Sequence, residues 1–211
     1  MGTTRVRRRA GTVVYTSKRG GRRPARRRAR RKMSGLFFAV LLVLIILASW
    51  SRLYGAFERA THPLEYAPQI RAASQKFGVD PTLVAGVIYT ESRFGHDSES
   101  SKGAYGLMQL MPSTARFVAG HSGIRGDYRD PGVNIEMGTW YLSYLERRYP
   151  QDERLALAAY NSGEGKVAQW GLRPGFRLRQ IPYAETRDYV RNVLAAQKTY
   201  RRLYGPELRG G

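Results

Sequence analysis

Glu91 is the residue whose type and position most clearly suggest chemistry in this sequence. It follows Val84, Val87 and Ile88 in an i, i+3, i+4, i+7 pattern, so a helix would place its carboxyl group on the apolar stripe that faces a core. A carboxyl group beside an apolar wall ionises less readily, which raises its pKa toward the range that a general acid needs near neutral pH. An ion pair with Arg93 or another arginine at the helix end is the structural alternative, and it stays open at this point.

A second polar group lies within the apolar segment 103–112, whose sequence is Gly-Ala-Tyr-Gly-Leu-Met-Gln-Leu-Met-Pro. The amide of Gln109 can donate and accept hydrogen bonds, and a buried amide needs partners. Sugar hydroxyls and N-acetyl groups would serve as partners, but backbone groups within the fold would serve equally well. Gly103 and Gly106 would let the backbone approach a ligand closely.

Helices must position these side chains, and start signals for several helices are present. Asp80 followed by Pro81 predicts the start of the helix that carries Glu91, because aspartate caps helices and proline suits the first helical position. The same kind of signal occurs at Pro112. Further helices are expected at about residues 67–77, 112–117, 134–148, 154–160 and 186–203.

The expected fold class is mainly α. No convincing run of alternating apolar and polar residues predicts a strand, apart from a short ribbon within residues 95–107. In the last expected helix Tyr189, Val190, Val193 and Leu194 share one face, and we expect them to point inward. The length allows one ordinary domain, which we expect at residues 66–205, followed by a short tail at 206–211.

Residues 33–50, Met-Ser-Gly-Leu-Phe-Phe-Ala-Val-Leu-Leu-Val-Leu-Ile-Ile-Leu-Ala-Ser-Trp, contain no charge. At about 1.5 Å per residue a helix of this length spans about 27 Å, close to the hydrocarbon thickness of a bilayer. A buried core helix would normally have a polar face, and this segment has none. A cleaved signal peptide is the main alternative, but the apolar run is long and no clear Ala-x-Ala site follows. We therefore expect one transmembrane helix, followed by a linker at residues 51–65.

Residues 1–32 form a basic arm that contains 14 of the 36 arginines and lysines and none of the 16 acidic residues. The net charge of +20 is therefore mostly a property of this arm, and the remainder of the chain is only modestly basic. A basic segment before an apolar span predicts a cytoplasmic N-terminus and an extracytoplasmic domain. We expect a disordered arm attracted to anionic lipid headgroups, and no nucleic acid binding. Nothing in the sequence indicates a protein partner.

No metal or other cofactor is expected. The chain has no cysteine, which excludes disulfides and cysteine-built metal sites. Its three histidines, His62, His96 and His121, lack the spacing of metal ligands on a helix.

Four segments occur in a defined order: Glu-Ser-Arg-Phe at 91–94, the segment 103–112, Ala-Ala-Tyr-Asn-Ser-Gly-Glu-Gly at 158–165, and Ile-Pro-Tyr-Ala-Glu-Thr-Arg-Asp-Tyr-Val at 181–190. Together they resemble the lytic transglycosylases of the soluble lytic transglycosylase (SLT) type, whose fold is similar to goose-type lysozyme. Ser162 stands where that family usually has alanine. The resemblance covers roughly residues 66–203 and implies a lysozyme-like α-helical domain, so the arm and the apolar span lie outside it.

The resemblance also implies roles for individual residues. Glu91 would be the catalytic acid and base. Six other residues would contact the substrate or support the site: Ser100, Met108, Gln109, Tyr160, Asn161 and Glu185. Most of these also have structural interpretations, since Met108 and Tyr160 would suit a core, Asn161 a helix C-terminus, and Glu185 the acidic first turn of a helix.

The number of well-placed carboxylates bears on the type of reaction. Ordinary glycosidases use two, and only Glu91 is well placed here, because Asp97 and Glu99 match no second catalytic position. The resemblance implies that Glu91 cleaves the β-1,4 bond between N-acetylmuramic acid and N-acetylglucosamine in peptidoglycan, and that the 6-hydroxyl of the sugar then closes a 1,6-anhydro ring. The alternatives are a lysozyme-type hydrolase of the same bond and an inactive wall-binding scaffold. The expected location is the bacterial inner membrane, with a single span and the catalytic domain outside the cytoplasm.

Overall fold

The computed structural model describes residues 25–210, with side chains from residue 40 onward except at positions 48 and 51. It divides into two compact units, of which the first ends at Arg52 and the second begins at Leu53. Most of the expected basic arm, residues 1–24, lies outside the described residues, so its disorder stays a prediction.

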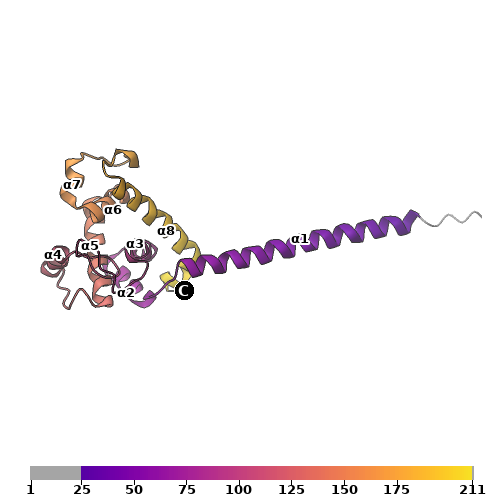
Figure 1. Ribbon diagram of the computed structural model, residues 1–211, viewed down its shortest axis with the longest axis horizontal. Coiled ribbons are helices and arrows are strands. Elements are labelled where there is room, and N and C mark those ends of the chain that lie inside the picture. Colours follow the sequence, from indigo (N-terminus) through magenta and orange to yellow (C-terminus); the bar gives the residue numbers. More distant parts are fainter. Residues whose placement is uncertain (1–24, 211) are drawn as a thin grey trace, which may run out of the picture. The chain divides into compact units, whose positions relative to one another are not determined.

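Helix α1 (Ala25–Thr61) contains the expected membrane span (Figure 1). The large apolar side chains between Val40 and Leu47 are 41–59% exposed. Among the described residues, Val40–Thr61 is the one helical segment that is long and apolar enough to cross a membrane. Such an exposed apolar surface suits a lipid environment better than water.

Helix α1 also extends through most of the segment expected as a linker. In the second unit its last turns pack on helix α8 (Ala184–Arg209), where Glu58 forms a two-pronged ion pair with Arg202. Just beyond the helix, the carbonyl of Pro63 accepts a hydrogen bond of 2.8 Å from the hydroxyl of Tyr200. Residues 53–63 are therefore an ordered part of the second unit.

The second unit is built from helices. After the end of α1 they are α2 (Ala67–Phe77), α3 (Pro81–Ser92), α4 (Pro112–Ser122), α5 (Pro131–Arg148), α6 (Glu153–Ser162), α7 (Glu164–Gln169), the short 3₁₀ helix η1 (Leu178–Gln180) and α8 (Figure 1). The described residues contain no strand, and the ribbon expected near 95–107 amounts to two isolated bridges, Glu99 with Tyr105 and Tyr105 with Leu110. The mainly α fold class is confirmed.

Side-chain caps explain where helices α3 and α5 begin. The carboxylate of Asp80 accepts a hydrogen bond of 2.8 Å from the backbone of Thr82, so α3 starts where the sequence predicts. Helix α5 begins at Pro131, three residues earlier than expected, because Asp130 caps it. Helix α8 continues through most of the segment expected as a tail, and Leu208 is buried there.

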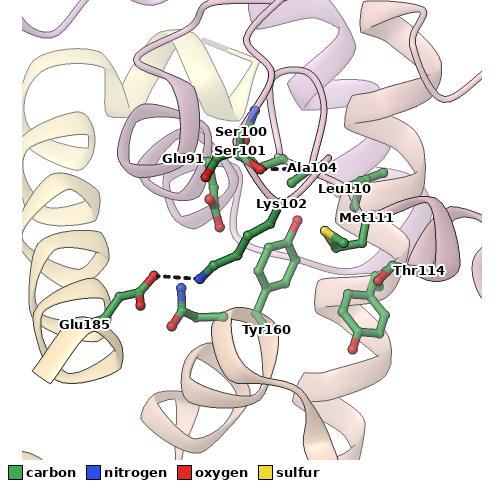
Figure 2. A pocket seen from close by; sticks show the side chains of 13 residues that line it. Glu91, Ser100, Ser101, Lys102, Ala104, Leu110, Met111, Thr114, Tyr160 and Glu185 are labelled. Carbon is green, nitrogen blue, oxygen red and sulfur yellow. Dashed lines mark hydrogen bonds and ion pairs between the residues drawn. The ribbon is translucent and has the colours of Figure 1, made fainter. Parts of the chain in front are cut away.

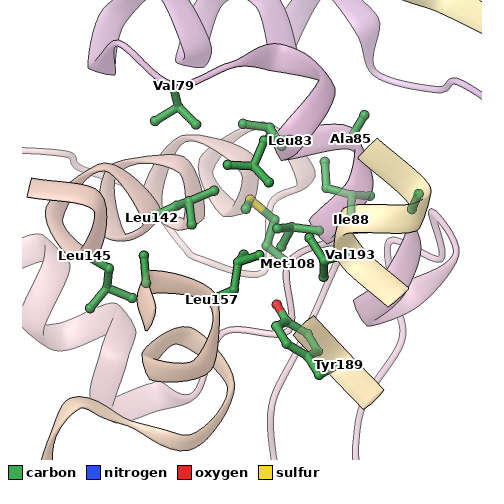
Figure 3. Packing of buried hydrophobic residues seen from close by; sticks show 14 of the residues in the cluster. Val79, Leu83, Ala85, Ile88, Met108, Leu142, Leu145, Leu157, Tyr189 and Val193 are labelled. Atoms are coloured by element: carbon green, nitrogen blue, oxygen red, sulfur yellow. The ribbon is translucent and has the colours of Figure 1, made fainter. Parts of the chain in front are cut away.

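Helix α3 lies at the centre of the core, and every residue from Thr82 to Ile88 is buried (Figure 3). It packs closely against α8 because position 86 is glycine. A Cβ atom at Gly86 would lie 3.0 Å from the backbone nitrogen of Gln197 and 3.1 Å from the carbonyl of Val193. This contact holds α3 against α8. The last turn of α3, which carries Glu91, lies at the edge of the core.

Candidate active site

Glu91 lies in the last turn of α3, on the wall of a cleft of about 330 Å³ (Figure 2). The helix ends there because Arg93 and Phe94 both have positive φ angles, 51° and 67°. The hydroxyl of Ser92 donates a hydrogen bond of 2.9 Å to the carbonyl of Leu107. The end of α3 is thereby attached to the loop that forms the adjacent wall.

Burial raises the pKa of Glu91 to about 7. The hydroxyl of Tyr189 acts in the opposite direction, as a donor that favours the ionised form. That hydroxyl is buried and has no partner at hydrogen-bonding distance among the described residues, so its contact with Glu91 is longer than a standard hydrogen bond. The carboxyl itself is half-buried and faces the cleft. A group with this pKa can release and recover a proton near neutral pH.

The hydroxyl groups of two tyrosines lie close enough to Glu91 to be affected by its charge. Burial and the negative charge of Glu91 raise the pKa of both Tyr160 and Tyr189 well above the ordinary value, so both hydroxyls stay protonated. Tyr160 donates a hydrogen bond of 2.9 Å to the carbonyl of Met108. The Tyr189 hydroxyl therefore remains as a donor for Glu91. Helical spacing predicts Tyr189 in the core, where it lies, but does not reveal a role in the site. The signal that could have indicated one is general, because a buried tyrosine hydroxyl usually requires a partner.

The loop between α3 and α4 forms the wall that carries Ser100 and Gln109. The hydroxyl oxygen of Ser100 accepts a hydrogen bond of 3.0 Å from the backbone of Ala104 and closes a tight turn. The amide nitrogen of Gln109 donates to the carbonyls of Ser98, at 2.9 Å, and Gly106, at 3.0 Å. Backbone carbonyls thus accept the hydrogen bonds that the Gln109 amide nitrogen donates, so its amide oxygen is the group that can accept a hydrogen bond from a ligand.

Asn134, on α5, holds this loop in place and was not expected to do so. Its side chain is fully buried. Its oxygen accepts a hydrogen bond of 2.8 Å from the backbone of Met108, and its nitrogen donates to the carbonyls of Tyr105 and Tyr128. A Cβ atom at Gly106, where φ is 82°, would lie 2.5 Å from the Asn134 amide nitrogen, so glycine is required there.

Asn161 and Glu185 form the opposite side of the cleft, together with Tyr160. The amide oxygen of Asn161 accepts a hydrogen bond of 2.9 Å from the hydroxyl of Thr186, which connects α6 to the start of α8. Glu185 lies 3.8 Å from the ammonium group of Lys102 (Figure 2). The structure therefore brings six predicted site residues to one cleft: Glu91, Ser100, Gln109, Tyr160, Asn161 and Glu185.

Met108 is the exception, and its expected place along the cleft requires correction. Its side chain is fully buried and packs against α5, where a Cβ atom at Gly138 would lie 2.4 Å from the Met108 sulfur. The loop backbone turns the side chain inward because Asn134 binds the Met108 amide group. Met108 contributes to the site through its backbone carbonyl, which accepts the Tyr160 hydroxyl.

Position relative to the cleft separates Glu91 from the other acidic residues. Burial, followed by the charges of Glu153 and Asp80, also raises the pKa of Glu146 to about 7, but Glu146 does not line the cleft. Asp97 and Glu99 are exposed and do not line it either. Among the described residues, Glu185 is the second carboxylate of the cleft, and it is 75% exposed.

Comparison with known proteins identifies the family. Residues 68–181, more than half of the chain, match the profile of the transglycosylase SLT domain. The chain belongs to the transglycosylase SLT domain family. Within this SLT chain, residues 180–208, which include most of α8, also match the soluble lytic transglycosylase helical domain. The resemblance seen in the sequence is confirmed.

Similar proteins include the soluble lytic murein transglycosylase of Salmonella typhimurium, which is 34% identical over 155 residues. That alignment covers 68% of the SLT chain and 24% of the relative. The membrane-bound lytic murein transglycosylase C of Serratia proteamaculans is 34% identical over 168 residues, which cover 65% of this chain and 47% of the relative. The SLT chain thus spans about a quarter to a half of the length of these relatives.

Solved structures share the fold. The 70 kDa soluble lytic transglycosylase of Escherichia coli aligns with a TM-score of 0.65 and 31% identity, over 72% of this chain and 26% of that one. The lytic transglycosylase Slt of Pseudomonas aeruginosa, solved as an inactive variant with glutamine in place of a glutamate, aligns with a TM-score of 0.63 and 32% identity. That alignment covers 68% of this chain and 25% of the Pseudomonas protein.

Proposed function

We propose that this chain is a membrane-anchored peptidoglycan lytic transglycosylase. It would cleave the β-1,4 bond between N-acetylmuramic acid and N-acetylglucosamine with formation of a 1,6-anhydro ring. The observation that carries the proposal is a single half-buried carboxyl group, Glu91, which has a pKa of about 7 and faces the cleft of an SLT domain. The names of the relatives support the substrate and the reaction.

The proposed mechanism uses Glu91 twice. In its protonated form it donates the proton to the bridging oxygen, so the glycosidic bond breaks and N-acetylglucosamine leaves with a hydroxyl group. The resulting carboxylate then accepts the proton of the 6-hydroxyl, whose oxygen attacks the oxocarbenium-like carbon and closes the ring. The two steps restore protonated Glu91 and consume no water. The hydroxyl of Tyr189 would stabilise the carboxylate between these steps, because a donor favours the ionised form.

The other cleft residues would hold the sugar. Ser100 can donate its hydroxyl proton, and Gln109 can accept through its amide oxygen, because their remaining groups are engaged by the loop. Asn161 can donate through its amide nitrogen, since its oxygen already accepts from Thr186. We propose that these side chains, with Tyr160 and Glu185, position the substrate beside Glu91.

The proposed location follows from α1 and from the basic segment before it. The apolar helix and the membrane-bound relatives support an association with a membrane. We propose a single-pass anchor in the bacterial inner membrane, with residues 66–205 as the catalytic domain outside the cytoplasm, because basic residues precede the span. A protease added to intact spheroplasts should digest the domain, and complete protection of the domain would contradict this topology.

Product analysis tests the proposed function. The full chain in detergent is incubated with purified sacculi, and the released fragments are analysed by mass spectrometry. We expect muropeptides with anhydro ends from the wild-type chain and none from the Glu91→Gln variant. Fragments with reducing ends alone would favour hydrolysis, with Glu185 or another acidic residue as the second carboxylate. Absence of any release by a folded wild-type chain would favour the scaffold.

A further inference from the structure

Lys102 is a cleft residue to which the proposed mechanism assigns no task. It lies in the turn between Ser100 and Gly103, and its side chain extends along the mouth of the cleft toward α8 (Figure 2). Among the described residues that line the cleft, it is the one basic side chain. The pKa of Glu91 is set by burial and by Tyr189. The charge of Lys102 is therefore available for another partner.

The present partner of Lys102 is Glu185, and their ion pair is weak. The ammonium nitrogen lies 3.8 Å from the carboxylate oxygen, and the two side chains are 77% and 75% exposed. Exposed ion pairs at this distance contribute little to stability, because water and salt screen them. An anionic group that enters the cleft can therefore replace Glu185 at low cost.

We propose that Lys102 is a specificity-determining residue that binds a carboxylate of the substrate and releases Glu185 when the cleft is filled. This inference rests on the proposed function, because it concerns the same cleft. Peptidoglycan offers two sources of this group, namely the lactyl carboxylate of a muramic acid that has lost its peptide, and the carboxylates of the peptide stem. A bound glycan excludes water from the cleft, so the new ion pair is less screened than the pair with Glu185.

The test measures binding to the full chain in detergent. All proteins carry Glu91→Gln so that the glycan is not cleaved, and Lys102→Gln, Lys102→Arg or Lys198→Gln is added. Lys198 is the matched control, because it is exposed on α8 and does not line the cleft. The ligands are solubilised strands with intact stems, strands freed of stems by an amidase, and stem-free strands whose carboxylates are converted to neutral amides.

We expect Lys102→Gln to weaken binding of at least one carboxylate-bearing strand roughly fivefold, which is the upper range for an ion pair near a surface. Lys102→Arg should retain most of the affinity, and the loss should decrease as salt is added. A loss confined to stem-free strands identifies the lactyl group, and a loss confined to intact strands identifies the stem.

An equal change on the neutral strands, or no change on any strand, would overturn the role of Lys102. Either result leaves the proposed function standing if wild-type protein releases anhydro products. Failure of the proposed function is a separate outcome, in which the wild-type protein releases none.

Discussion

Replacement of Glu91 by glutamine should make the protein more stable at alkaline pH. Burial raises the pKa of this carboxyl group from 4.5 to about 7, so ionisation of Glu91 costs more in the folded protein than in the unfolded chain. Glutamine has nearly the same shape and does not ionise. The variant should therefore lack this cost, and the gain in stability measures how strongly the fold disfavours the charge.

The size of the effect follows from the shift in pKa. One pKa unit corresponds to about 1.4 kcal/mol, so a rise from 4.5 to about 7 corresponds to about 3 kcal/mol once Glu91 is fully ionised. The side chain is half-buried and faces the water of the cleft, which offsets part of this cost. We expect the variant to be more stable than the wild type by about 2 kcal/mol at alkaline pH.

The dependence on pH has a definite sign. Below about pH 4.5 Glu91 is protonated in both states, so the two proteins should differ little. Between about pH 4.5 and 7 the folded state binds more protons than the unfolded chain, so wild-type stability falls relative to the variant as the pH rises. The difference should become constant about one pH unit above the raised pKa, where Glu91 is ionised in both states. Urea unfolding of the full chain in detergent, followed by tryptophan fluorescence from pH 4 to 9, measures this difference.

Two outcomes would refute this reasoning. A variant that is less stable than the wild type at every pH would show that Glu91 forms stabilising contacts that glutamine cannot replace. A gain that does not change with pH would show that the environment of Glu91 does not disfavour its charge. The second outcome would rule out the raised pKa and with it the proton donor, and the first would do so where the difference between the two proteins also stays constant with pH.

Two further predictions concern residues around Glu91. Tyr189→Phe removes a donor that favours ionised Glu91, so the pKa of Glu91 should rise. The alkaline limb of the pH dependence of kcat/KM should then move to higher pH, and kcat should fall about tenfold. An unchanged alkaline limb would argue against the contact between Tyr189 and Glu91. Asn134→Ala removes three hydrogen bonds with backbone groups, although the carbonyl of Tyr105 still accepts from the amide of Leu110. The free energy of unfolding in urea should fall by about 2–4 kcal/mol, and a loss below about 1 kcal/mol would mean that water replaces the amide.

Features that depend on neighbouring residues could be predicted from the sequence. The start of α3 is encoded by Asp80 and Pro81, which act within one turn of the helix. The place of Glu91 at the edge of the core follows from helical spacing alone. The start of α5 shows the limit of this reasoning. Asp130 and Pro131 give the same kind of start signal, but the apolar stripe begins only further along the chain and predicts a later start.

Features that depend on contacts between distant segments could not be predicted. The inward orientation of Met108 follows from its hydrogen bond with Asn134, which is 26 residues away. The pairing of Lys102 with Glu185 depends on how α8 lies against the loop after α3. Tyr189 illustrates a different difficulty. The sequence spacing of a tyrosine on an apolar helical face is the same whether or not its hydroxyl contacts a catalytic group.

The origin of the oxygen atom that replaces the bridging oxygen on the anomeric carbon tests the central claim most directly. If Glu91 acts without a second carboxylate, the oxygen of the sugar's own 6-hydroxyl forms the new bond to the anomeric carbon, and no water is consumed. Purified glycan strands are incubated with the full chain in water enriched in the heavy oxygen isotope, and the masses of the products are measured by mass spectrometry. We predict anhydro products without heavy oxygen from the wild type and no cleavage by Glu91→Gln. Heavy oxygen at the new reducing end would contradict the account and identify a hydrolase.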